Sequence, residues 1–216
     1  MYAQPAFRMD DQAEMAALIE ARHFATLVVS GEDGPVATHI PMILNRDAAG
    51  TLVSLEGHVA RNNPLAAAAA RPVRALAIFA GADAYVTPSL YPSKHEHGKV
   101  VPTWNYMAVH VSGEVEAFSD AGVLLAQVNR ITDMMEQLAA VPWKVSDAPD
   151  DYVGKMLNAI TGVRLTISSI EGIRKISQNI SEADRGGVLN GFTHSNEPGA
   201  RQLAVEMTQF SSKAEA

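Results

Sequence analysis

Short apolar runs with a two-residue period, separated by turn-forming residues, dominate the first third of the chain. Residues 24–29 are rich in β-branched and aromatic side chains, and residues 36–44 resume the pattern after Gly31-Glu32-Asp33-Gly34. Two such runs joined by an Asp-Gly turn are typical of a β-hairpin. A second turn at residues 45–50 leads to a third run at 51–59. The spacing therefore predicts three strands in an antiparallel meander.

The rest of the chain alternates further strands with single helices. Helices are predicted where capping side chains precede good helix formers or an apolar stripe: after Asp10 and Asp11, after Asn63, and at residues 119–138, 149–160 and 181–189. Further strands are predicted at residues 73–79, 84–87, 109–115, 163–167 and 173–176. Turns at Gly81 and at Glu171-Gly172 would end two of these strands.

This order of elements favours a mainly β fold with flanking helices, built on a small antiparallel barrel. A doubly wound sheet would require a regular alternation of strands and helices, which is not seen here. The length of 216 residues suits one elaborated domain. We expect that domain to span residues 1–192, with residues 193–216 forming a C-terminal tail, helical or mobile.

Charge and composition exclude several classes of function. The chain has 17 basic and 24 acidic side chains, for a net charge of −7, so direct binding to duplex DNA is not expected. It has no cysteine, which excludes disulfides, thiolate metal sites and cysteine nucleophiles. No signal peptide is visible, and no apolar run approaches the ~20 residues of a membrane span. We therefore expect a cytoplasmic protein with no membrane association.

Familiar catalytic motifs are also missing from the sequence. There is no Gly-rich phosphate loop and no nucleophile elbow. His95 and His97 flank Glu96 in a predicted loop, but a solvated polar loop explains so weak a pattern better than a metal site does. Accordingly we assign no catalytic residue and expect no metal.

The segment at residues 57–64 delivers Arg61 and Asn62 to a predicted helix start. Free amide groups at a helix N-terminus favour an anion, and an arginine adds a permanently charged, forked donor. The segment is thus a candidate phosphate site. The alternative is that Asn62 or Asn63 caps the helix and that Arg61 is only a solvated charge.

The segment at residues 99–106 combines a lysine with two aromatic residues. Trp104 and Tyr106 would share one face of a strand, and Thr103 and Asn105 the other. Aromatic side chains near Lys99 suit a flat, partly anionic heterocycle. Packing in the core or at a subunit interface is the alternative for the aromatic residues.

A third segment, residues 172–179, is a basic strand end that leads into polar donors. Lys175 and Gln178 could contact the edge of a ligand. Equally, Arg174 and Lys175 could solvate an exposed hairpin.

Together these segments resemble the PaiB family of FMN-binding negative transcriptional regulators. The resemblance rests on Thr38-His39-Ile40-Pro41, GHVARNNP (57–64), YPSKHEHGKVVPTWNYMAVH (91–110), Pro142-Trp143, KISQN (175–179) and residues 182–185. It covers nearly the whole chain except the tail, and the stretch at 91–110 is its most specific part.

The resemblance implies an antiparallel split β-barrel of the FMN-binding type and a homodimer that holds FMN between its subunits. The flavin ring would lie along residues 38–42, and Arg61 and Asn62 would hold the phosphate. Residues 99–104 would form a wall for the ring or be contributed by the partner subunit. The expected cofactor contacts are Thr38, His39, Ile40, Pro41, His58, Arg61, Asn62, Lys99, Val101, Thr103, Trp104, Lys175 and Gln178.

Three functions are consistent with this sequence. The first is a flavin-binding regulator, which the resemblance implies. The second is an FMN-dependent oxidoreductase or flavin reductase, because a bound flavin supplies its own hydride chemistry and needs no catalytic side chain. The third, which we rank last, is a haem-binding split barrel with His97 or His110 as the axial ligand.

Overall fold

The computed structural model describes residues 1–31, 33–137 and 139–214, with side chains described as far as residue 211. The chain divides into two compact units. Unit 1 comprises Met1–Leu18, Ala80–Val109 and the chain from Glu171 onward, and unit 2 comprises Ile19–Phe79 and His110–Ile170. The predicted turn residue Glu32 and the predicted helix residue Leu138 lie outside the described residues.

The strands form one antiparallel sheet in the order β3-β2-β6-β7-β8-β5-β4, with β1 paired to β8. The strands are β1 (Arg8–Met9), β2 (Phe24–Gly31), β3 (Gly34–Pro41), β4 (Ile43–Arg46), β5 (Leu52–Ala60), β6 (Val73–Val86), β7 (Thr103–Phe118) and β8 (Ile160–Lys175). Most are long and alternate buried with exposed side chains, as expected of strands that cover one core. The prediction of a mainly antiparallel β fold with flanking helices is confirmed.

Unit 2 contains the barrel. Strand β3, at one end of the sheet order, lies against β5 near its other end. The approach is so close that a Cβ at Gly57 would lie 2.6 Å from the carbonyl oxygen of Pro41. The barrel core includes the fully buried side chains of Leu27, Leu55 and Phe79. Glycine at position 57 therefore lets the barrel close.

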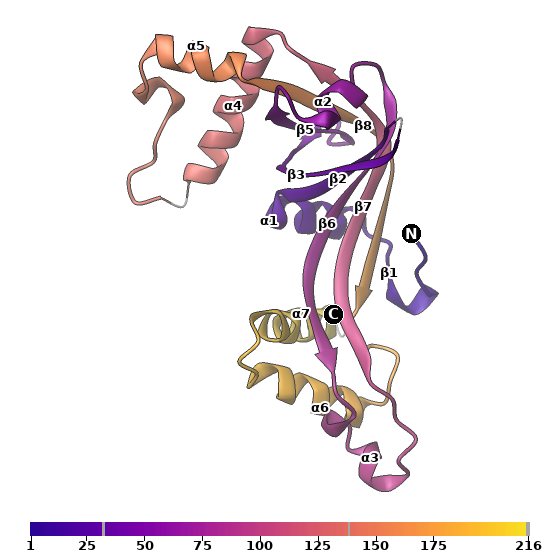
Figure 1. The fold of residues 1–216 in the computed structure, drawn as a ribbon. Coiled ribbons are helices and arrows are strands. Elements are labelled where there is room, and N and C mark those ends of the chain that lie inside the picture. Colours follow the sequence, from indigo (N-terminus) through magenta and orange to yellow (C-terminus); the bar gives the residue numbers. More distant parts are fainter. Residues whose placement is uncertain (32, 138, 215–216) are drawn as a thin grey trace. The chain divides into compact units, whose positions relative to one another are not determined.

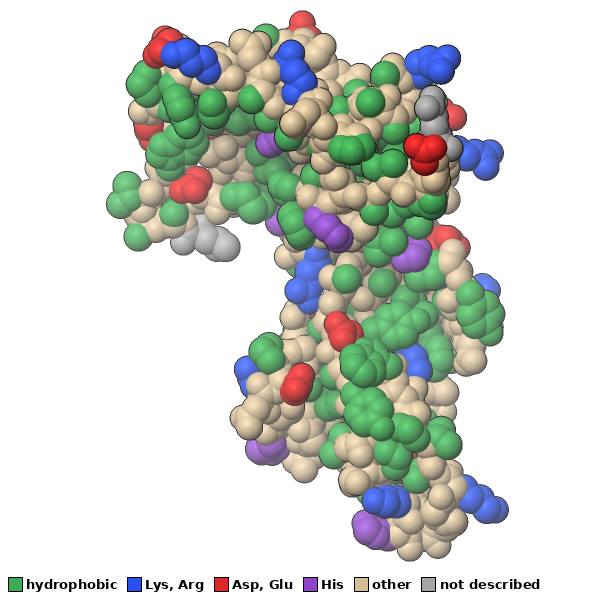
Figure 2. Space-filling model, in the orientation of Figure 1, with side chains coloured by type: hydrophobic (Ala, Val, Ile, Leu, Met, Phe, Trp, Pro, Cys, Tyr) green, Lys and Arg blue, Asp and Glu red, His purple; other side chains and the backbone are tan. Residues whose placement is uncertain are grey.

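Helices α2 (Pro64–Ala68), α4 (Ala121–Glu136) and α5 (Asp150–Asn158) also belong to unit 2. Asp120 caps α4 by accepting a hydrogen bond from the Val123 amide at 2.9 Å, as predicted. Helices α4 and α5 contact each other, and hydrophobic side chains gather over this region in Figure 2. Trp143 and Tyr152 are among those that remain exposed there.

Unit 1 is built around a helical hairpin. Helices α6 (Glu182–Thr193) and α7 (Pro198–Ala214) lie side by side (Figure 1) and bury Phe192 and Leu203 among other residues. A Cβ at Gly187 would lie 2.0 Å from the Leu90 carbonyl oxygen, so α6 packs directly on the backbone of η2 (Pro88–Leu90). Unit 1 also holds η1 (Pro5–Phe7) and α3 (Ser93–Glu96).

Two turns predicted at glycines are wrong. Strands β6 and β8 run without a break through Gly81 and Gly172. Each glycine instead permits a close approach, because a Cβ would lie 2.7 Å from the Met107 Cβ at Gly81 and 2.8 Å from the Met9 Cβ at Gly172. Glycine inside a strand often marks such a contact.

The strand predicted at residues 36–44 is divided in two. The amide of Met42, between β3 and β4, donates to the carbonyl oxygen of His23 at 2.7 Å. His23 follows α1 (Gln12–Arg22) and has a φ of 50°, the left-handed conformation that commonly ends a helix. The strand is thus interrupted at Met42, because its amide bonds to the end of α1 and not to a neighbouring strand.

None of the helices in the described part of the chain is long and apolar enough to cross a membrane.

Candidate functional site

The predicted flavin-ring strand lies in β3 of unit 2, and its side chains alternate in exposure. Ile40 is 5% exposed and contacts the barrel interior near Gly57, whereas His39 is exposed. The His39 ring stacks on Phe24 with a centroid distance of 6.2 Å and accepts or donates a hydrogen bond at Thr26 Oγ1. Because Phe24 is 59% exposed, this pair presents a flat surface to the outside of the barrel.

The predicted phosphate residues lie at the end of β5. Asn63, rather than Asn62, caps α2, because its Oδ1 accepts from the Leu65 amide at 2.9 Å. The Asn63 amide also donates to Thr38 Oγ1 at 2.9 Å, which ties β3 to the start of α2. Arg61 and Asn62 stay exposed, and no acidic side chain of the described chain pairs with Arg61.

This donor set fits a phosphate by its chemistry, because Arg61, Asn62 and the Thr38 hydroxyl all offer hydrogen-bond donors. The helix contributes less than the sequence predicted. It has only five residues, and Asn63 already occupies one of its first amide groups. The arginine fork is therefore the principal charge available to an anion at this place.

His58, also in β5, is bonded within unit 2. Its Nδ1 lies 3.0 Å from Oε1 of Gln127, which is 1% exposed. Nearby in β5, the 7%-exposed Glu56 accepts from Arg164 Nε at 2.7 Å and from Arg130 Nη1 at 3.3 Å. Arg130 also donates to Asn45 Oδ1. The charged groups around Glu56 thus satisfy one another.

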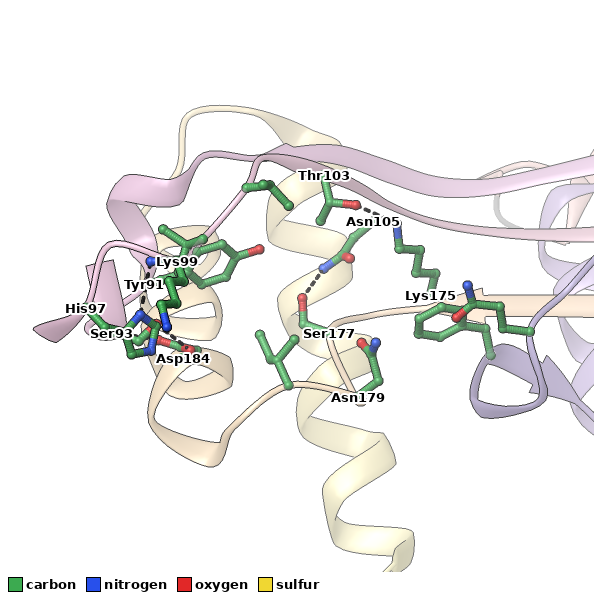
Figure 3. A pocket seen from close by; sticks show the side chains of 15 residues that line it. Tyr91, Ser93, His97, Lys99, Thr103, Asn105, Lys175, Ser177, Asn179 and Asp184 are labelled. Carbon is green, nitrogen blue, oxygen red and sulfur yellow. Dashed lines mark hydrogen bonds between the residues drawn. The ribbon is translucent and has the colours of Figure 1, made fainter. Parts of the chain in front are cut away.

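Unit 1 contains a cavity of about 400 Å³, shown in Figure 3. Four predicted contacts come together in its lining: Lys99, Val101, Thr103 and Lys175. At one end of the cavity, Lys175 Nζ donates to Thr103 Oγ1 at 2.5 Å. His97, Ser93 and Asp184 lie at the other end, with Asn105 and Ser177 between (Figure 3).

Asn105 is the most deeply buried polar residue of this cavity. It is 0% exposed, and its Nδ2 donates to Ser177 Oγ at 2.8 Å, while its Oδ1 has no hydrogen-bond partner. The Tyr91 hydroxyl points into the same space (Figure 3). The lining therefore offers both a donor and an unused acceptor.

Asp184 is held by α3 and by its own helix. It accepts from the Ser93 amide at 3.0 Å and from Ser93 Oγ at 2.8 Å. The Ser93 amide bond is the main reason that the pKa of Asp184 lies below its ordinary value. Burial, and secondarily the negative charge of Asp184, raises the pKa of Tyr91, so that its hydroxyl stays protonated and able to donate.

Two predicted contacts that belong to unit 1, Trp104 and Gln178, do not line the cavity. Trp104 lies on the opposite face of β7, as the predicted alternation requires, and its Nε1 donates to Asp83 Oδ1 at 3.1 Å. Gln178 donates to the carbonyl oxygens of Ala6 and Arg174, and its Oε1 accepts from the Ile176 amide. Its side chain thus fixes the turn after β8.

The sequence reading missed Tyr91, Asn105, Ser177 and Asp184 as site residues. Only Asn105 carried a usable signal, because strand alternation places it on the same face as Thr103. In the described residues, no cluster of three His, Cys, Asp or Glu side chains could hold a metal ion.

Residues 1–169 match the family model described as "Putative FMN-binding domain". The chain belongs to this FMN-binding family. Its cofactor is accordingly FMN, as predicted.

Two relatives support this assignment. The uncharacterized protein AN0679 of Emericella nidulans is 33% identical over 186 residues, covering 72% of this chain and 74% of the relative. The protease synthase and sporulation protein PAI 2 of Bacillus subtilis is 26% identical over 207 residues, covering 96% of each chain. The predicted resemblance to the PaiB family is thereby confirmed.

Solved structures agree on the fold. The flavocytochrome Anf3 of Azotobacter vinelandii gives a TM-score of 0.60 at 14% identity, over 83% of this chain and 74% of that one. An FAD- and heme-binding protein of Mycobacterium smegmatis gives a TM-score of 0.59 at 16% identity, over 83% of this chain and 78% of that one. The split-barrel prediction is confirmed.

Proposed function

We propose that this chain is a cytoplasmic, homodimeric FMN protein of regulatory function that holds the flavin phosphate at Arg61 and Asn62. The observation that carries the proposal is the exposed donor set at the end of β5, where no described acidic group neutralises Arg61. Thr38, tied to Asn63, adds a hydroxyl beside the strand predicted to carry the ring. FMN, when bound, supplies hydride and electron transfer.

The exposed stacked pair of Phe24 and His39 supports the placing of the ring and the homodimer. An aromatic surface outside a barrel favours either a flat ligand or a partner chain. If the flavin is held between two subunits, this aromatic surface contacts both the flavin ring and the partner chain. Sedimentation of the purified chain tests the oligomeric state, and a monomer that still binds FMN at full strength would contradict this part of the proposal.

The regulatory role is supported by the full-length relationship to PAI 2. A net charge of −7 argues against binding duplex DNA directly, so we expect regulation through flavin state or a protein partner. A sequence-specific gel shift by the purified protein at physiological salt would contradict this expectation. Reduction of bound FMN by NADH or NADPH in stopped flow would instead favour an oxidoreductase.

The test of the site is FMN titration of matched variants. We expect Arg61→Ala to weaken FMN binding by about 10- to 150-fold, because a charge-assisted fork to phosphate contributes about 1.5–3 kcal/mol. Arg71→Ala, which removes another exposed arginine of unit 2, is the control and should bind as the wild type does. The loss in FMN affinity should be larger for Arg61→Ala than for Lys175→Ala. Equal titration curves for Arg61→Ala and the wild type would remove the phosphate assignment.

A further inference from the structure

The cavity of unit 1 presents positive charge that the chain does not neutralise. Of the described carboxylates, none forms an ion pair with Lys99 or Lys175. Asp184 is the acidic group of the lining, and Ser93 already donates to both of its oxygens. Two lysines that line a cavity and form no ion pair with a described carboxylate favour an anionic occupant.

Asn105 adds a second, independent indication of a ligand. Its buried Oδ1 lacks a donor, although buried side-chain oxygens are almost always paired. The amide nitrogen of the same side chain donates to Ser177 Oγ. Ser177 itself has a φ of 62°, in the left-handed region. Non-glycine residues in that region cluster at functional sites, where the surrounding structure maintains the strain. A bound hydroxyl or amino group would complete the hydrogen bonding of Asn105.

Apolar side chains make up part of the lining, and the volume of the cavity limits the size of the ligand. Phe7, Val100, Val101 and Ile180 form walls around the polar groups. A volume of about 400 Å³ lies near the lower end for small-molecule pockets. It suits a one-ring acid better than a three-ring flavin with a phosphate tail.

We propose that this cavity binds a small aromatic carboxylic acid that carries a hydroxyl or amino group, at a site separate from that of FMN. The carboxylate contacts the Lys175 ammonium, the ring packs between Phe7 and the valines, and the ligand donates to Asn105 Oδ1. The Tyr91 hydroxyl donates a further hydrogen bond.

The experiment is isothermal titration of FMN-saturated full-length protein with 4-hydroxybenzoate as the probe. Two analogues separate the parts of the recognition. 4-Hydroxybenzyl alcohol keeps the donor but lacks the anion, and benzoate keeps the anion but lacks the donor. We expect saturable binding of one 4-hydroxybenzoate per chain, at least about tenfold weaker binding of the alcohol, and weaker binding of benzoate by several-fold.

The matched variants are Lys175→Met and Lys94→Met. Lys94 is an exposed lysine of the same unit that donates to Ser89 and does not line the cavity. We expect Lys175→Met to weaken 4-hydroxybenzoate at least about tenfold, and Lys94→Met to bind as the wild type does. Because Lys99 is exposed, Lys99→Met serves as a second variant whose folding is not at risk, with a smaller loss expected.

Three results would overturn the proposal. One is no saturable binding by the wild type up to millimolar probe, and another is equal affinity in Lys175→Met and Lys94→Met. The third is displacement of the probe by FMN, with Lys175→Met losing FMN as strongly as Arg61→Ala, which would make the cavity part of the flavin site. A chain that binds 4-hydroxybenzoate but no FMN would leave this site standing and contradict only the proposed function.

Discussion

Two clusters of charged residues, one in each unit, differ in how their charges are paired. In unit 2, Glu56 is 7% exposed and accepts hydrogen bonds from Arg130 and Arg164. In unit 1, the partners of Lys175 among the described residues are the Thr103 hydroxyl and, more distantly, the Phe7 ring, whose centroid lies 5.9 Å from its Nζ. In the first cluster, opposite charges pair with one another, and we call this network closed. In the second, Lys175 forms no ion pair with a described carboxylate, and we call this cluster open.

This difference separates structural charge from charge kept for a ligand. Burying ionised groups carries a desolvation cost that pairing offsets, so a closed network needs no outside partner to explain it. An open cluster beside a cavity does need one. In the sequence both clusters are only charged residues in separate predicted elements, so the distinction emerges from their pairing in the folded chain.

The largest expected effect comes from breaking the closed network. Glu56→Gln removes the negative charge and leaves two guanidinium groups facing an amide. We expect the free energy of unfolding to fall by about 2 kcal/mol, less than for a fully buried pair because Arg130 and Arg164 are 49% and 40% exposed. Urea denaturation measures the change.

The control for this variant is Glu116→Gln, at an exposed position of β7 in the same unit. Its unfolding free energy should stay within about 0.5 kcal/mol of the wild type. If Glu56→Gln is no less stable than Glu116→Gln, the network around Glu56 does not stabilise the fold. The contrast between the Glu56 and Lys175 clusters then fails.

A smaller, pH-dependent effect is expected at Asp184. Its pKa is lowered in the folded protein, chiefly by the Ser93 amide, so ionised Asp184 stabilises the fold above its ordinary pKa. That contribution is lost as the pH falls below about 4, through the lowered folded pKa. Asp184→Asn should therefore lower the thermal midpoint at neutral pH, and its difference from the wild type should shrink in acid.

Asp151→Asn provides the comparison for that titration. Asp151 forms an exposed pair with Lys155 on α5, with both side chains more than 70% exposed. Its substitution should change the thermal midpoint little at any pH. A difference between wild type and Asp184→Asn that persists unchanged at pH 3 would show that the Ser93 contacts do not depend on the carboxylate charge.

Much of the fold was predictable because its signals are local. Asp120 and Ser181 cap the helices predicted to begin beside them, and of the two candidates Asn62 and Asn63 it is Asn63 that caps α2. The alternation at residues 103–106 correctly placed Thr103 and Trp104 on opposite faces. Such patterns depend on neighbours within a few residues and can be read directly.

What the sequence did not predict depends on distant partners. Gly81 was interpreted as a turn because nothing nearby reveals that Met107 would approach it. The bond between Asn105 and Ser177 joins residues 72 positions apart. The incomplete pairing of Asn105 is likewise a property of the assembled cavity and has no signature along the chain.

The smallest expected effect tests the open cluster itself. In the absence of ligand, Lys175→Met should change the free energy of unfolding by no more than about 0.5 kcal/mol, because the ammonium has no described carboxylate to lose. With saturating 4-hydroxybenzoate, the wild type should gain stability in urea denaturation and the variant should gain much less. If Lys175→Met without ligand lowers the free energy of unfolding by about 2 kcal/mol, as expected for Glu56→Gln, then Lys175 has a structural role. The two clusters would then differ less than their pairing indicates.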